Sequence, residues 1–162
     1  MTPPVYSPLR RALHWITAVL ILSQWWTSRA VLRTHEHHGM PGHVPDPTDM
    51  LLHRFHVLGG LAVLVVVMLR LALRLRDGSP PLPAAIPGWA RTWSRPAHLA
   101  LYAVLVGLVG SGLIASYLWF PMSRVHGALV KALYGLILLH VGAVILHDVA
   151  HRAGLLRRMT RG

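Results

Sequence analysis

The sequence contains no cysteine, and acidic residues are nearly as scarce. Without cysteine there are no disulfides, no thiolate-bound metals and no cysteine-ligated iron–sulfur clusters. Only five of the 162 residues are Asp or Glu, and all charged residues together make up 13% of the chain, against about a quarter in ordinary soluble domains. Because 54% of the residues are hydrophobic, the chain is too apolar for an ordinary soluble domain.

Four long apolar runs account for this excess. A membrane-spanning helix needs about 20 mostly apolar residues, because each residue advances the helix by about 1.5 Å. The runs predict spans over about residues 9–28, 50–76, 95–119 and 123–153. They leave no room for a separate soluble domain. The sequence therefore predicts an all-α integral membrane four-helix bundle that forms a single domain over residues 1–162.

Capping residues indicate where these helices begin and end. Signals typical of a helix start stand at Ser7-Pro8, at Asp46 or Asp49, at Ser94 with Pro96, and at Ser123. Signals typical of a helix end stand at Asp77-Gly78 and Gly154. The stretch between the first two spans is polar and rich in histidine, whereas the stretch between the second and third is rich in proline.

The basic residues lie at the ends of the apolar runs. A net charge of +11 is compatible with nucleic-acid binding, but such proteins gather arginines on a folded polar surface, so lipid is the expected partner and nucleic acid is not. One side of the predicted membrane carries eleven basic residues: Arg10, Arg11, Arg70, Arg74, Arg76, Arg91, Arg95, Arg152, Arg157, Arg158 and Arg161. The other carries five: Arg29, Arg33, Arg54, Arg124 and Lys131. Because cytoplasmic loops are enriched in Lys and Arg, both termini are predicted to be cytoplasmic.

Histidines within the predicted spans are the candidate functional residues, because ionisable groups in a membrane are costly. His126 and His140 are fourteen residues apart, so both leave nearly the same face of the last helix, separated by about 21 Å along its axis. His14 is expected at the depth of His140, near the cytoplasmic surface. His56 is expected at the depth of His126, near the outer surface. The sequence therefore predicts two stacked pairs, His14–His140 and His56–His126.

Paired imidazoles at two depths are typical of haem iron held by two axial histidines, an arrangement suited to electron transfer. Haem attached through a C-x-x-C-H motif is excluded by the lack of cysteine. Small residues beside the histidines would let a macrocycle approach the backbone; these are Gly59, Gly60, Gly127, Gly142, Gly107, Gly110 and Gly112. The same glycines are also compatible with plain helix packing in lipid.

Several short motifs, in order, carry a family resemblance. They are Arg-Ala-Leu-His-Trp ending at Trp15, Phe55-His56-Val57 followed by Leu69-Arg70 and Leu73-Arg74, Ala97-His98-Leu99 with Tyr102, His126-Gly127, and Leu139-His140 with His147. In these residues the chain resembles the bacterial cytochrome b561 family of the inner membrane, which is related to the haem subunits of formate dehydrogenase and nickel hydrogenase. The resemblance implies two haem b groups on four helices, ligated by histidines of the first, second and fourth.

The resemblance also implies a function. A family member of enteric bacteria oxidises superoxide at the outer surface and reduces ubiquinone, so superoxide:quinone oxidoreduction is the leading hypothesis. Arg54 and Arg124 each stand two residues before a candidate ligand and would steer an anion towards the outer haem. His147 is the candidate for proton exchange with quinone near the cytoplasmic side. The alternative is a non-catalytic electron conduit that serves a periplasmic redox protein.

Other residues have weaker assignments. Lys131, Arg70, Arg74 and His98 are candidate partners of haem propionates, and snorkelling to the interface is the alternative for Lys131. His53 is a rival ligand to His56, because three residues separate them on one helix. The polar loop with His35, His37, His38 and His43 is a candidate copper or zinc site.

Overall fold

The computed structural model describes residues 6–36, 44 and 46–161, and four long helices dominate this part of the chain. They are α1 (Pro8–Glu36), α2 (Pro47–Asp77), α3 (Gly88–Tyr117) and α4 (Ser123–His151). A 3-10 turn, η1 (Phe120–Met122), connects α3 to α4, and a short helix, α5 (Leu155–Thr160), ends the described chain. The described residues contain no β-strand, which agrees with the predicted all-α class.

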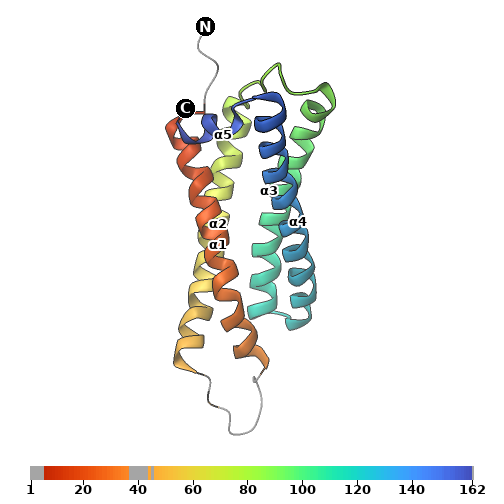
Figure 1. Cartoon of the computed structure of the whole chain (residues 1–162). Helices are drawn as coiled ribbons and strands as arrows, with labels where there is room; N and C mark the ends of the chain where they lie inside the picture. Colours follow the sequence, from red (N-terminus) through yellow and green to blue (C-terminus); the bar gives the residue numbers. More distant parts are fainter. Residues whose placement is uncertain (1–5, 37–43, 45, 162) are drawn as a thin grey trace.

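The helices run alternately up and down, and α1 lies along α2 while α3 lies along α4 (Figure 1). The two pairs join mainly through α2 and α3. We call the end of the bundle that holds α5 the α5 end, and the end that holds η1 the loop end. At the α5 end, the indole nitrogen of Trp15 donates a hydrogen bond of 3.0 Å to the carbonyl of Met159, so α5 returns to the first turns of α1. The Asp148 carboxylate fixes the start of α5 by accepting from the Leu155 and Leu156 backbone amides.

Three of the expected helix signals act as predicted. The Ser7 hydroxyl accepts from the Arg10 amide in the first turn of α1, and Asp46 accepts from the amides of Thr48 and Asp49 as the N-cap of α2. Gly78 ends α2 with a φ of 72°, a left-handed value that glycine adopts without steric cost. Asp49 is not a cap, since it pairs with Arg33 across the α1–α2 junction.

Other helix ends differ from the prediction. α3 begins at Gly88 rather than near Ser94, so Pro96 lies inside the helix. A proline within a helix removes one backbone hydrogen bond, which membrane helices tolerate more readily than soluble ones. At the start of α4, Met122 rather than Ser123 is the cap. α4 ends at His151, where Arg152 takes a left-handed conformation, and Gly154 precedes α5 instead of ending α4.

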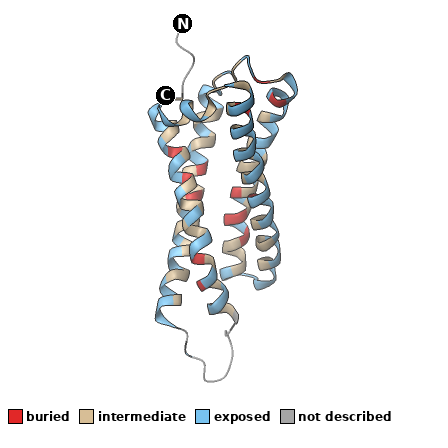
Figure 2. Ribbon diagram, viewed as in Figure 1, coloured by how far each residue is buried: buried red, intermediate tan, exposed pale blue. Residues whose placement is uncertain are grey.

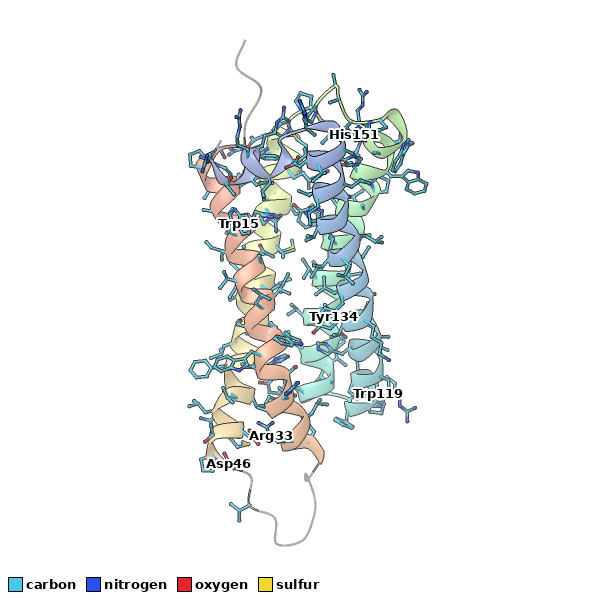
Figure 3. The ribbon with its side chains drawn as sticks, in the orientation of Figure 1. Trp15, Arg33, Asp46, Trp119, Tyr134 and His151 are labelled. Carbon is cyan, nitrogen blue, oxygen red and sulfur yellow. The ribbon has the colours of Figure 1, made fainter. Side chains whose placement is uncertain are left out.

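Three helical segments among the described residues are long and apolar enough to cross a membrane: Pro47–Asp77, Gly88–Tyr117 and Phe120–His151. α1 has the length of a span, but polar residues such as Ser23, Gln24 and Thr27 interrupt it. Most outward faces are exposed (Figure 2), and the exposed side chains include many large hydrophobic ones. All six tryptophans are exposed, with Trp15 towards the α5 end and Trp119 towards the loop end (Figure 3). Tryptophan at both ends of apolar helices is typical of the two membrane interfaces. The chain is a multi-pass helical membrane protein.

The buried core lies midway along the bundle. It comprises Val63, Val67, Leu105, Leu108, Val109 and Leu133, from α2, α3 and α4. Leu133 stands seven residues from both His126 and His140. An apolar layer therefore separates the two levels at which the candidate histidines lie.

Candidate functional site

The helices bring the four candidate histidines together in two pairs. His14 of α1 and His140 of α4 meet near the α5 end, with ring centroids 6.3 Å apart. His56 of α2 and His126 of α4 meet near the loop end, with centroids 6.5 Å apart. Both contacts join helices far apart in sequence, across the space between the α1–α2 and α3–α4 pairs (Figure 1).

Both separations fit one metal ion between two imidazoles. A metal–imidazole bond is about 2.0 Å long, so ring centroids 6.3 and 6.5 Å apart leave room for one metal ion between the two rings. Among the described residues, no group of three or more His, Asp or Glu side chains is placed to hold a metal ion. Each histidine pair offers two ligands, so the other positions of a bound metal would be filled by another group, such as a macrocycle.

The loop-end pair has its hydrogen bonds arranged for such ligation. The Thr27 hydroxyl donates to the Ser23 carbonyl, so its oxygen accepts from Nδ1–H of His56 at 3.0 Å. Nδ1–H of His126 donates to the Leu108 carbonyl at 3.0 Å. Each ring therefore carries its proton on Nδ1, which leaves the Nε2 lone pair free for a metal. Such hydrogen bonds orient ligating histidines and increase their basicity.

The α5-end pair differs, because an arginine occupies the equivalent position. The Arg70 guanidinium donates to His14 Nδ1 at 3.1 Å and to the Thr17 hydroxyl at 3.0 Å. It also lies 5.7 Å from the ring centre of Tyr102. Arginine can only donate, so His14 Nδ1 accepts and a neutral His14 holds its proton on Nε2. His14 can bind a metal through Nε2 only when that proton is absent and Arg70 has left Nδ1.

His98 and Arg74, two candidate partners of haem propionates, also lie towards the α5 end. His98 lies 5.3 Å from His140 between ring centroids, and its Nδ1 donates to the Ser94 carbonyl at 2.6 Å. Arg74 is half-buried one turn beyond Arg70 and makes no side-chain hydrogen bond to a described residue. Arg74 is thus near this level without touching either ligand candidate.

His147 is buried one level closer to the α5 end. Its side chain is 6% exposed, and among the described residues its Nδ1 has no hydrogen-bond partner. The ring lies 6.2 Å from that of Trp89 and 5.5 Å from that of His151. A buried polar atom without a partner is costly, which makes this position a candidate for a ligand's oxygen.

A small cavity opens at the loop end, and neither His56 nor His126 lines it. It has a volume of about 170 Å³ and is lined by Met50, His53, Arg54, Val57, Ser116 and Tyr117. Arg54 and Val57 flank His56 along α2, so the cavity lies within a turn of that histidine. Arg124 and Lys131 are both exposed on α4 and do not line it.

The rival ligand His53 faces a different partner. Its ring lies 5.1 Å from His35 of α1, and His35 also contacts Phe120 at 5.4 Å. The prediction that His35 belongs to a loop is wrong, because α1 continues to Glu36. His37, His38 and His43 lie outside the described residues. His53 therefore contacts His35, while His56 faces His126.

Gly112 packs directly against the His126 ring, which provides a test of the loop-end geometry. A Cβ at Gly112 would lie 3.1 Å from Cε1 and 3.2 Å from Nδ1 of His126. Gly112→Ala is therefore expected to displace the imidazole and, if His126 is a haem ligand as predicted, to weaken haem retention at this level, measured as haem lost on dilution. Gly110→Ala is the matched control, because its Cβ would meet nothing within 4 Å. Equal haem loss in both variants would contradict this role for Gly112.

Fold and site together define a multi-pass helical membrane protein with two intramembrane histidine pairs. Residues 5–162 match the family described as prokaryotic cytochrome b561, so the chain belongs to this family, as the sequence motifs predicted. It is therefore a haem b membrane protein of electron transfer. Over 95% of its length it is 25% identical to a Yersinia pestis protein named "Probable superoxide oxidase CybB", covering 94% of that protein. No solved structure matches the chain.

Proposed function

We propose that the protein carries two haem b groups and transfers single electrons from superoxide at the loop end to ubiquinone at the α5 end. The observation that supports this most is the presence of two histidine pairs, with ring centroids 6.3 and 6.5 Å apart. When bound, haem b supplies a one-electron iron couple. His14 with His140 would hold one haem, and His56 with His126 would hold the other.

Superoxide is the proposed donor because a basic residue lines the cavity at the loop end, the end at which His56 and His126 lie. Arg54 lines the cavity beside His56, and a cation there attracts a small anion and raises its rate of encounter. The name of the Yersinia pestis relative agrees with this choice of substrate. Arg124 adds positive charge at the same end but farther from the cavity, so its contribution is expected to be smaller.

Quinone is the proposed acceptor because His147 provides a buried imidazole with an unpartnered nitrogen. Two superoxide ions, which leave as O₂, supply the two electrons that reduce one ubiquinone, and the reduced quinone takes up two protons. An imidazole can accept and donate such protons. Trp89 offers a flat apolar surface against the same ring. With both termini cytoplasmic, as the distribution of arginines predicts, this site would face the cytoplasm of a bacterial inner membrane and the cavity would face outward.

The test is stopped-flow haem absorption of the purified, oxidised protein mixed with superoxide, with and without ubiquinone. The expected result is haem reduction with a rate constant on the order of 10⁸ M⁻¹s⁻¹, since electrostatically steered encounters reach this range. Added ubiquinone should then reoxidise the haem. His147→Phe should leave the reduction unchanged and slow the quinone-dependent reoxidation.

Two outcomes would contradict the proposal in different ways. Haems that are intact but reduced slowly by superoxide would exclude it as the donor, and a periplasmic redox protein would then be the candidate donor. Reoxidation that is equally fast in His147→Phe would remove His147 from the quinone site. His151→Phe is the control, because His151 lies beside His147 and is more exposed.

A further inference from the structure

We propose that Arg70 makes the centre at the α5 end the higher-potential one of the two, so that electrons run downhill from the loop end to the α5 end. This inference rests on the proposed function, since it requires a haem at each histidine pair. One electron leaves the centre on His56 and His126 and arrives at the centre on His14 and His140. The two pairs differ in the charge that lies beside their ligands.

At the α5 end the side chain that hydrogen-bonds to the ligand candidate His14 is a cation. Arg70 is half-buried and lies 3.1 Å from His14 Nδ1, and its guanidinium is charged at every physiological pH. Arg10, at the same end, pairs with Asp77 at 3.0 Å and shares that carboxylate with Arg76 at 2.6 Å. Among the described residues, no Asp or Glu forms an ion pair with Arg70. Its positive charge therefore acts on the ligand without compensation from the protein.

At the loop end the groups that hydrogen-bond to the two ligand candidates are neutral oxygens. The Thr27 hydroxyl faces Nδ1 of His56, and the Leu108 carbonyl faces Nδ1 of His126. Both accept a proton from the imidazole, and such hydrogen bonds increase the electron donation of a ligand to its metal. Stronger donation stabilises the oxidised iron. No cation of the described chain hydrogen-bonds to either ring, so this centre is expected to have the lower potential.

Binding of haem changes the contact of Arg70 but not the sign of its effect. A His14 that held iron through Nε2 would carry its proton on Nδ1 and could no longer accept from Arg70. Arg70 would keep its two other contacts, the Thr17 hydroxyl at 3.0 Å and the Tyr102 ring at 5.7 Å, which attracts the cation. A positive charge at this distance favours reduced iron, which carries one positive charge less than oxidised iron.

Spectroelectrochemical titration of the purified, haem-loaded protein tests the inference through potentials rather than turnover. Two one-electron waves are expected, of which His14→Ala removes the upper and His126→Ala the lower. At a fixed applied potential, Arg70→Gln should lower the ratio of reduced to oxidised haem in the upper wave about tenfold, a downward shift of about 59 mV for a one-electron couple. The lower wave should not move.

Matched variants distinguish the effect of Arg70 on the upper potential from the combined effect of the other basic residues at this end. Arg74→Gln removes a charge one turn away, and an equal shift there would overturn the assignment to Arg70. Loss of the lower wave in His14→Ala would overturn the order of the potentials. If Arg70→Gln loses a haem, its potential cannot be compared, and Arg70→Lys then tests the role of the charge. Because lysine retains the positive charge, the upper wave must stay in place in this variant. A wild-type protein that binds no haem would contradict the proposed function instead.

Discussion

If each histidine pair holds one haem, as proposed, replacing His14 or His126 with alanine is expected to halve the haem content, from two per chain to one. Each histidine faces a single partner across the bundle, and the two pairs lie about 21 Å apart along α4, so the loss of one ligand leaves the other pair intact. A b-type haem is held without covalent attachment, so removal of one axial ligand weakens its retention directly. Haem extracted from purified protein, divided by protein concentration, measures the effect.

The choice between His53 and His56 gives this prediction a matched control. The two residues stand one turn apart on α2, but the His56 ring lies 6.5 Å from His126, whereas the His53 ring lies 5.1 Å from His35. His56→Ala should therefore lose one haem, and His53→Ala should keep both. The reverse pattern would show that His53 is the ligand and that the pairing at the loop end is wrong.

The pairing of the histidines could be predicted from the sequence because it depends on helix geometry alone. Fourteen residues return a helix to nearly the same face, so His126 and His140 lie on one side of α4 whatever their surroundings. The depths of His14 and His56 then follow from the start of their own helices. Residues far apart in sequence meet in the structure as expected, while their role as haem ligands stays a prediction.

The hydrogen-bond partners of these histidines could not be predicted in the same way. Thr27 stands in α1, twenty-nine residues from His56, and the Leu108 partner of His126 is a backbone carbonyl. The only signal for Thr27 was its place among several polar residues, such as Ser23 and Gln24, in a mostly apolar run. For Leu108 there was none, because every residue has a carbonyl. Such contacts depend on how the helices pack and rotate against one another.

The predicted start of α3 was wrong because helix packing, which the sequence does not show, also decides where a helix begins. Ser94 and Pro96 form a good helix-start signal, but Pro87 takes that role seven residues earlier, and the helix continues through Pro96. Two valid signals competed, and local preference alone does not decide between them. Packing between this added helical segment and α4 favours the longer helix: Trp89 lies against His147. The longer helix thereby forms part of the proposed quinone site.

Reversing the charge of Arg54 is expected to slow the reduction of the haem by superoxide on the order of tenfold at low ionic strength. Arg54 lines the cavity beside His56, so a glutamate there would repel the anion at the last step of its approach. The effect should shrink as salt is added, because the screening length falls from about 30 Å at 0.01 M to about 8 Å at 0.15 M. Stopped-flow reduction of the Arg54→Glu variant over a range of salt concentrations measures both.

Arg124→Glu is the matched control, because it changes the same net charge at the same end of the molecule. Arg124 is exposed and lies outside the cavity lining, so its reversal should slow reduction less than that of Arg54. If both variants slow the reaction equally, the overall field of the loop end steers the anion and the cavity has no special role. If neither does, the anion reaches the haem by another route, and Arg54 holds an ordinary interfacial position.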